Sequence, residues 1–130
     1  MKQITIISEN RLGVVAEICG ALAAARVNIE SMDAETIGGS GVTKLTVDRY
    51  DDALRALAQT PFHAISEEAI VLQIEDRPGE LARITRRFKD ANISMRSVRI
   101  IRRADGASIV AISTERTEEA MELVKDVMIS

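Results

Sequence analysis

The chain has 130 residues with a formal net charge of −3, and 46% of them are hydrophobic, 28% charged and 2% aromatic. This composition is that of a globular protein and not of a disordered chain, and nowhere do the roughly 18 consecutive apolar residues of a membrane helix occur. The acidic balance gives no overall attraction to nucleic acid or to a membrane, and the N-terminus lacks the features of a secretory signal, so we expect a cytoplasmic protein without a nucleic-acid or membrane partner.

The first half of the chain alternates strand and helix signals. A β-branched segment at 3–7 predicts a buried strand, and apolar residues at three- and four-residue spacing predict a helix over 12–26. The expected apolar face of this helix consists of Val15, Ile18, Cys19, Leu22 and Ala25. The other predicted elements of this half are a hairpin of strands at 27–37 and 42–48 around the sequence GGSG, a helix at 51–59 and a short strand at 62–66.

The second half repeats this order without its last element. The predicted elements are a strand at 69–75, a helix at 78–91, hairpin strands at 92–103 and 107–113 around Asp105-Gly106, and a helix at 117–127. Only Met128, Ile129 and Ser130 follow Val127, too few to span a sheet. We therefore expect the last strand to be short or missing, with an open sheet edge unless something covers it.

Two successive β-α-β-β-α-β patterns predict an α+β protein of two tandem ferredoxin-like units, residues 1–67 and 68–130. Each unit should have an antiparallel four-stranded sheet with two helices on one face. Units this small bury a limited core and leave one sheet face and the edges uncovered. We therefore expect the units to pair with each other or with a second chain, and we predict a homodimer.

A duplicated motif marks the loop between the first strand and the first helix of each unit. The sequence IEDRPGELARI at 74–84 aligns with SENRLGVVAEI at 8–18. Residues 10–13 therefore correspond to residues 76–79, and the same apolar positions follow in both copies. The repeat places the same turn at the start of a helix in both units.

Such a turn has two interpretations. A helix N-terminus offers unpaired backbone N–H groups to a carboxylate or phosphate, and Gly13 and Gly79 leave that backbone accessible to a ligand. The simpler interpretation is a tight strand-to-helix turn, in which Asn10 and Asp76 cap the helices and Pro78 begins the second one. The residues alone favour the simpler interpretation.

The run Asp-Arg-Pro-Gly-Glu-Leu-Ala after a strand, with Asn-Ile one helix later at 28–29 and 92–93, resembles the ACT domain, a small amino-acid-sensing module of metabolic regulation. Both copies match, and the chain resembles small stand-alone proteins of two tandem ACT units. The resemblance implies a β-α-β-β-α-β fold and units docked side by side through their sheets. It also implies an effector amino acid held where one unit's loop meets a strand of its neighbour.

Site residues carry over to this sequence by position. The residues that match the family's ligand loop, or the strand positions that close its pocket, are Asn10, Leu12, Gly13, Val14, Asn28, Ile29, Asp76, Pro78, Gly79, Glu80, Leu81, Asn92 and Ile93. Leu12 stands where the usual motif has proline. Backbone N–H groups would meet the amino acid's carboxylate, an Asp or Asn side chain its ammonium, and apolar residues its side chain.

Catalysis and metal binding have little support. Cys19 and His63 are the only cysteine and the only histidine, which argues against a disulfide framework and against a zinc or copper site. The chain has no nucleophile and base pair and no phosphate-binding loop of the glycine-lysine-serine type. We therefore expect a protein that is not an enzyme, with no catalytic residues, no metal ligands and no cofactor.

The segment 83–103 is the one basic region. It contains Arg83, Arg86, Arg87, Lys89, Arg96, Arg99, Arg102 and Arg103. Ferredoxin-like sheets that bind RNA stack bases on central-strand aromatics, and the few aromatics here are predicted elsewhere. We interpret the segment as a solvated helix face and hairpin, with an acidic partner or an anionic ligand as the functional alternative.

These observations predict a non-catalytic regulator that binds an amino acid and modulates a partner, such as a metabolic enzyme in trans. The alternative is a ligand-free interaction or oligomerisation module, or a regulatory subunit of an enzyme.

Overall fold

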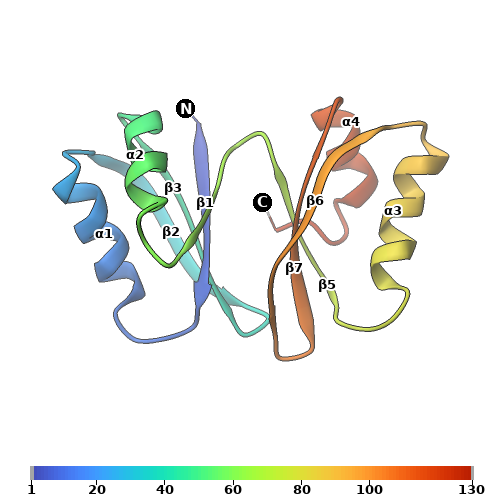
Figure 1. Ribbon diagram of the computed structural model, residues 1–130, viewed down its shortest axis with the longest axis horizontal. Coiled ribbons are helices and arrows are strands. Elements are labelled where there is room, and N and C mark those ends of the chain that lie inside the picture. Colours follow the sequence, from blue (N-terminus) through green and yellow to red (C-terminus); the bar gives the residue numbers. More distant parts are fainter. Residues whose placement is uncertain (1, 130) are drawn as a thin grey trace. The chain divides into compact units, whose positions relative to one another are not determined.

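The computed structural model describes residues 2–129, and Figure 1 shows their helices and strands. The chain divides into two compact units between residues 67 and 68. Among the described residues, no helix is both long and apolar enough to cross a membrane.

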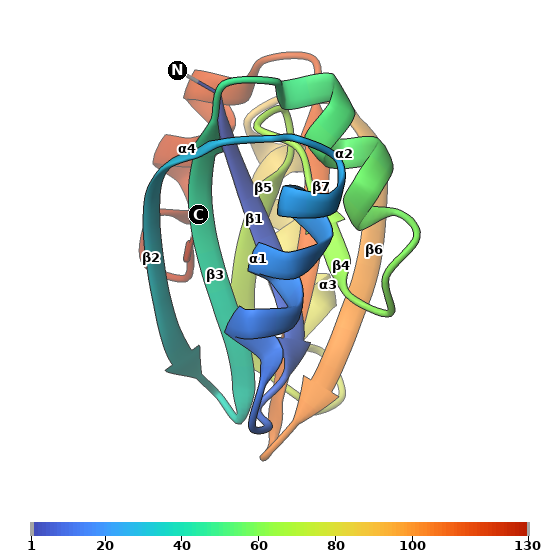
Figure 2. The same ribbon diagram turned by 90° about the vertical axis from the view of Figure 1, so that its left-hand side faces the viewer.

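The first unit is a four-stranded antiparallel sheet with two helices on one face (Figures 1 and 2). Its elements are β1 (Gln3–Glu9), α1 (Val14–Ala24), β2 (Ile29–Ile37), β3 (Ser40–Val47), α2 (Tyr50–Leu57) and β4 (His63–Ile65). The strand order is β2-β3-β1-β4, so β2 and β4 form the edges of this sheet. This is the expected ferredoxin-like arrangement.

The core of the first unit lies between the sheet and its two helices. Ile4 and Ile6 of β1 point to the helix side and pack with Ile18 and Leu22 of α1 and with Leu57 of α2. Because side chains alternate along a strand, the residues between them point to the opposite sheet face.

The apolar face of α1 begins one residue earlier than expected. Val14 is buried in the core, whereas Val15 is 43% exposed, and Cys19 is only partly buried. The expected place of Val15 on the core face is therefore wrong. The physical reason is that the helix starts at Val14, which sets the direction of each side chain.

The second unit has the same architecture with a three-stranded sheet. Its elements are β5 (Ile70–Glu75), α3 (Glu80–Asp90), β6 (Met95–Ala104), β7 (Ala107–Thr114) and α4 (Thr117–Val124). The strand order is β5-β7-β6, with antiparallel pairing throughout. Leu72, Ile84, Phe88, Val110 and Val124 are fully or almost fully buried in its core.

The expected absence of a full closing strand is confirmed, and a short segment stands in its place. Helix α4 ends at Val124, so the chain turns back and forms an antiparallel bridge between Leu72 and Met128. The N–H of Gln73 donates to the carbonyl of Val127 (2.9 Å), and the N–H of Ile129 donates to the carbonyl of Val71 (2.8 Å). The edge of β5 is thus partly covered by the end of its own unit.

Candidate functional site

An open groove of about 450 Å³ lies in the first unit beside the loop between β1 and α1. Its lining comes from three segments: the end of β1 with the following loop and first turn of α1, the second half of β2, and the start of β3. The residues involved are Ser8, Glu9, Asn10, Arg11, Leu12, Gly13, Val14, Val15, Ala16, Ala34, Glu35, Thr36, Gly41 and Thr43. The groove therefore lies between a helix N-terminus and an edge strand.

One wall of the groove is the N-terminus of α1. Gly13 precedes the helix with a φ of 89°, a conformation that glycine adopts without strain. The N–H of Glu17 donates to the carbonyl of Gly13 (2.9 Å), so the N–H groups of Val14, Val15 and Ala16 have no partner within the helix. No side chain caps this end. The wall can therefore bind a carboxylate.

The opposite wall and the floor carry small and polar side chains. The Oγ1 of Thr36 donates to the Oδ1 of Asn10 at 3.4 Å, which connects β2 to the loop. Gly41 lies so close to β1 that a Cβ there would be 2.5 Å from the Oγ of Ser8. Asn10 and the neighbouring Glu35 supply oxygen acceptors for an ammonium group. The groove therefore combines N–H donors for a carboxylate with oxygen acceptors for an ammonium group.

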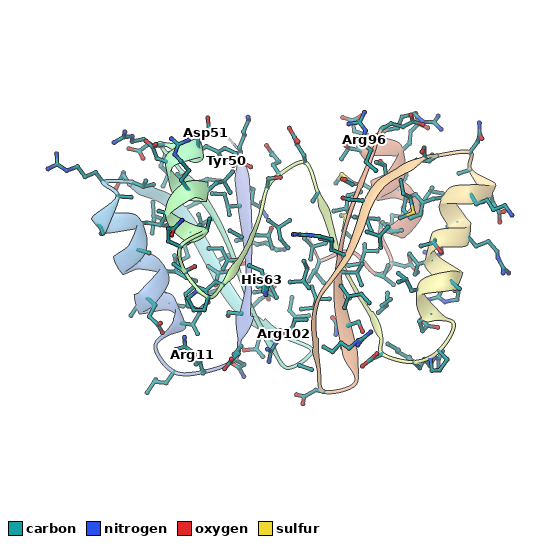
Figure 3. All side chains as sticks on the ribbon, viewed as in Figure 1. Arg11, Tyr50, Asp51, His63, Arg96 and Arg102 are labelled. Carbon is teal, nitrogen blue, oxygen red and sulfur yellow. The ribbon has the colours of Figure 1, made fainter. Side chains whose placement is uncertain are left out.

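An ion pair fixes the tip of the loop. Both terminal guanidinium nitrogens of Arg11 donate to the Glu17 carboxylate, with 3.2 Å between Nη2 and Oε1. This hydrogen bonding lowers the pKa of Glu17 below its ordinary value and raises the pKa of Arg11. Arg11 also lies 5.8 Å from the ring centre of Phe62. Figure 3 shows Arg11 at this end of the unit.

The corresponding loop of the second unit has nearly the same backbone conformation but different side chains. Gly79 precedes α3 with a φ of 90°, but the next residue, Glu80, is an acid with only 9% of its side chain exposed. Arg83 donates to Glu80 at 3.0 Å and Arg77 at 3.2 Å. The hydrogen bonds from Arg83 lower the pKa of the Glu80 carboxyl below its ordinary value. The first turn of this helix therefore carries a carboxylate of the chain itself, paired with two arginine side chains.

The expected helix caps are wrong in both units. The residues before the helices are Gly13 and Gly79, and no side chain of Asn10 or Asp76 caps them. Pro78 lies before Gly79 and outside the helix. Asp76 instead contacts the Nε of Arg103 (3.5 Å), and its N–H donates to the Gly106 carbonyl (2.9 Å). The cause is the left-handed glycine, which places the N-cap position three residues beyond the proposed cap.

The structure brings together only part of the predicted ligand site. Asn10, Leu12, Gly13 and Val14 lie in the first groove, with Leu12 98% exposed. Asn28 and Ile29 lie at the start of β2, whereas the groove uses Ala34 to Thr36 near its end. Asn28 has a structural contact in its own unit, because its backbone N–H donates to Asp48 Oδ1 (2.9 Å).

In the second unit, Gly79 is the predicted residue that lines the groove found on α3. That groove, of about 420 Å³, follows the arginine-bearing side of α3 through Gly79, Ala82, Arg83, Arg86, Arg87 and Asp90. Leu81 packs against the core, and Pro78 is exposed.

The two Asn-Ile pairs do not occupy equivalent places. Asn92 has a φ of 60° and follows α3, where Arg26, with the same φ, follows α1. The N–H of Ile93 donates to the carbonyl of Phe88, as that of Val27 donates to the carbonyl of Leu22. Asn92 thus corresponds to Arg26, and Ile93 to Val27. The expectation that Asn92-Ile93 opens a strand is wrong, because β6 begins at Met95.

Sequence reasoning missed the residues that β2 and β3 contribute to the groove. Ala34, Thr36, Gly41 and Thr43 carry no motif. The hairpin signal at Gly38-Gly39 was the usable clue, because a hairpin there brings the end of β2 to the same end of the sheet as the end of β1. Within residues 2–129, no group of three or more His, Cys, Asp or Glu residues is placed to hold a metal ion.

Comparison with known proteins gives a match to one family model within the first unit and a shared fold for the whole chain. The family model described as ACT domain matches residues 2–61. A protein of known crystal structure from Bacteroides thetaiotaomicron is 19% identical, with a TM-score of 0.51 over 98% of this chain and 90% of that one. At this identity, the likeness shows a shared fold.

Two further solved structures cover both units with lower scores. The regulatory subunit of aspartate kinase from Thermus thermophilus has 19% identity and a TM-score of 0.45, over 96% of this chain and 91% of that one. The acetolactate synthase small subunit from Thermotoga maritima has 14% identity and a TM-score of 0.42, over 99% and 89%. No curated protein matches the sequence.

Proposed function

Because residues 2–61 match the ACT domain family model and both units have the ACT-type fold, we propose that this chain is a non-catalytic regulatory protein that binds an amino acid. The groove of the first unit is the proposed effector site. The observation that carries this proposal is the uncapped N-terminus of α1 in the same groove as the Asn10 carboxamide.

The groove suits the two charged groups that every free amino acid carries. Backbone N–H groups after Gly13 would bind the carboxylate, and the Asn10 carboxamide, with Glu9 and Glu35 nearby, would bind the ammonium. Val15, which is partly exposed beside the groove, would contact the effector's side chain. An acceptor-rich wall opposite a donor-rich wall favours a zwitterion over a simple anion.

The remaining predicted residues enter as part of a composite site. In the ACT resemblance a neighbouring unit closes the pocket, so Asn28, Ile29, Asn92 and Ile93 are proposed to act from such a neighbour. The second loop, with Asp76, Pro78, Gly79, Glu80 and Leu81, is the proposed counterpart. Its carboxylate at Glu80 makes it the weaker site for an effector's carboxylate.

Regulation would follow from a shift between docked arrangements. An effector that contacts two units stabilises one arrangement by its difference in affinity, and a partner enzyme of amino-acid metabolism would sense that arrangement. We propose a cytoplasmic homodimer as the working form. One observation favours the alternative of a ligand-free interaction module: Leu12 is almost fully exposed at the loop tip, where a partner protein can bury it.

Thermal unfolding against each of the twenty amino acids tests the proposal. An effector at about 100 times its dissociation constant adds roughly 2.7 kcal/mol of stability. We expect a shift of the midpoint for one chemical class of amino acid. No shift with any of the twenty would contradict effector binding and favour the interaction module.

The variants Gly13→Val and Gly79→Val form a matched pair for this test. Both glycines have the same left-handed φ, so valine strains both backbones alike. Only Gly13 lines the proposed site. We expect Gly13→Val to remove the midpoint shift and Gly79→Val to retain it. The opposite result would move the site to the second loop.

A further inference from the structure

A second groove runs along helix α3 of the second unit, drawn in yellow in Figure 1. Its volume of about 420 Å³ is close to the 450 Å³ of the groove in the first unit. The residues that line it lie at three- and four-residue spacing on one face of the helix: Gly79, Ala82, Arg83, Arg86, Arg87 and Asp90. The first two have no side chain or a short one, which leaves space beside the three arginines.

The fold does not require these three arginines, because the first unit lacks them. Helices α1 and α3 each have eleven residues and each begins after a left-handed glycine. The positions of the three arginines correspond in α1 to Glu17, Gly20 and Ala21. A helix of the same length therefore packs on the same kind of sheet without a basic side chain at any of these positions.

Carboxylates of the chain itself hold the two outer arginines in place. Arg83 donates to the Glu80 carboxylate through Nε (3.3 Å) and Nη2 (3.0 Å). Arg87 donates to the Asp126 carboxylate through Nη1 (2.7 Å) and Nη2 (3.1 Å). Each carboxylate uses only part of the N–H donors of its guanidinium partner. Both groups are therefore oriented before a ligand arrives, which lowers the entropy cost of binding.

The middle arginine of the groove has no such partner. Arg86 is exposed and forms no ion pair among the residues that the structure describes. Its neighbours have structural reasons for their charge, since Arg83 pairs with Glu80 and Arg87 lies in the last helical turn, where a cation is favourable. Like charges three residues apart on a helix repel, so an anion bound at Arg86 would relieve that repulsion.

The chemistry of the groove favours a phosphate group over a single carboxylate. Guanidinium groups bind phosphate oxygens through paired hydrogen bonds. A phosphate group carries more charge and more acceptor oxygens than a carboxylate, so it can contact more than one arginine at once. Asp90, also in the lining and exposed, is the opposing charge that weakens the attraction for any anion.

We propose that the groove along α3 binds the phosphate group of a small molecule, with Arg86 as the principal contact and Arg83 and Arg87 as flanking donors. Phosphate groups of a nucleotide and of a free polyphosphate share this chemistry. The site differs from the effector groove in its unit and in its class of ligand. It requires no bound amino acid, so it stands independently of the proposed function.

Isothermal titration calorimetry of the full chain with pyrophosphate tests the proposal, with the ionic strength held constant by sodium chloride. We expect saturable, equimolar binding. Arg86→Gln should raise the dissociation constant about tenfold or more, as expected for the loss of charge-assisted hydrogen bonds. Arg87 is left unchanged because it also donates to the Leu123 carbonyl (3.0 Å), so its substitution would loosen the packing of α3.

Two variants on the same helix sharpen the test. Lys89→Gln is the matched control, because it removes one positive charge from an exposed position that is not in the lining of the groove. We expect it to leave the dissociation constant nearly unchanged. Asp90→Asn should tighten binding, because it removes the carboxylate from the lining. A purely structural role of the arginines would not produce this gain. Far-ultraviolet circular dichroism checks that each variant keeps its fold.

Titration with ATP distinguishes the two sources of phosphate. Tighter binding of ATP than of pyrophosphate would support a nucleotide, and equal or weaker binding would support a free polyphosphate. The absence of saturable binding for both probes would overturn the proposal, and so would equal losses in Arg86→Gln and Lys89→Gln. Binding of a glutamate-rich peptide without binding of pyrophosphate would also overturn it and would assign the groove to an acidic protein. Gly13→Val should bind pyrophosphate as the parent chain does, so a failed effector site and a failed phosphate site give different results.

Discussion

The loops before α1 and α3 have nearly the same backbone and opposite chemistry. Gly13 and Gly79 have φ angles of 89° and 90°, and neither helix has a side-chain cap. The first turn after Gly13 begins with Val14, whereas the turn after Gly79 begins with Glu80, held by two arginines. The comparison teaches that the repeated motif gives the same turn in both units, while the residue after the glycine decides whether the first turn of the helix carries an acid.

The largest effect is expected when the charged residues of the second loop are introduced into the first. The variant V14E/E17R gives the first loop the acid and the second arginine of Glu80 and Arg83, while Arg11 already matches Arg77. The new carboxylate would compete with the effector's carboxylate at the helix N-terminus. We expect loss of the effector-induced stabilisation, roughly 2.7 kcal/mol at 100 times the dissociation constant, in thermal unfolding.

The reverse exchange, E80V/R83E, is the control for this prediction. It changes the second loop by the same kinds of residue and leaves the first groove intact. The midpoint shift should persist in it. A persistent shift in V14E/E17R as well would mean that the start of α1 does not bind the effector.

A second prediction concerns the close approach of β1 and β3 under the first groove. A Cβ at Gly41 would be 2.5 Å from Ser8 Oγ and 3.2 Å from the Glu9 carbonyl oxygen. Gly41→Ala should therefore lower the free energy of unfolding by about 1–3 kcal/mol, as overpacking does. Denaturant titration measures this, with Gly20→Ala as control.

Gly20 is suited to that control because a Cβ there meets nothing within 4 Å. It lies within α1, where alanine in place of glycine stabilises a helix by roughly 0.5–1 kcal/mol. An equal change for both substitutions would show that the strands under the groove can separate without cost.

A third prediction tests what the two loops share. A Cβ at Gly79 meets nothing within 4 Å, and one at Gly13 makes only an ordinary contact with Glu17 Oε2 at 3.8 Å, so the cost of alanine is that of the left-handed backbone, roughly 1–2 kcal/mol. We expect both substitutions to lower the free energy of unfolding of their own unit equally in denaturant titration. A clear difference would mean that one of the loops relaxes away from this conformation.

The smallest expected effect is the pH dependence of the second loop. The pKa of Glu80 is lowered from 4.5 in the folded chain, chiefly by the hydrogen bonds from Arg83. A lowered pKa stabilises the folded state above the unfolded value and loses this contribution as pH falls through the folded value. Glu80→Gln should therefore unfold at a lower temperature than the parent chain at neutral pH, and the gap should narrow below pH 4.5.

The corresponding control in the first unit is Glu17→Gln. Glu17 also has a lowered pKa, from its hydrogen bonds with Arg11, but its side chain is 47% exposed. We expect a weaker pH dependence, because solvent screens an exposed pair. A pH-independent gap in Glu80→Gln would show that the Glu80 carboxylate does not stabilise the folded chain.

The sequence was sufficient for the fold because its signals are local. The apolar spacing of Ile18 and Leu22 and the glycines at 38 and 39 each specify an element through near neighbours, and the element order then fixes the topology. The helix starts were misplaced because the prediction also relied on local signals. Asn10 and Asp76 are typical cap residues, but left-handed glycines, Gly13 and Gly79, occupy the N-cap positions.

The candidate site was less predictable because half of it is non-local. Thr36 and Gly41 reach the groove only through the β1–β3 and β2–β3 registers, which no motif encodes. The Glu80 side chain is part of the family's motif, but its pairing with Arg77 and Arg83 depends on the turn geometry. Sequence similarity predicted two like loops, whereas side-chain contacts make them unlike.

The bridge between Leu72 and Met128 has a consequence for how the second unit can be followed by hydrogen exchange. The Gln73 amide is held by the Val127 carbonyl, and the Ile129 amide by the Val71 carbonyl. Both bonds break when the short closing segment lifts, without opening the β5–β7 ladder. Those two amides should exchange together and faster than the amides of the β5–β7 ladder. Their exchange rate then measures how often the closing segment leaves the edge of β5 unpaired.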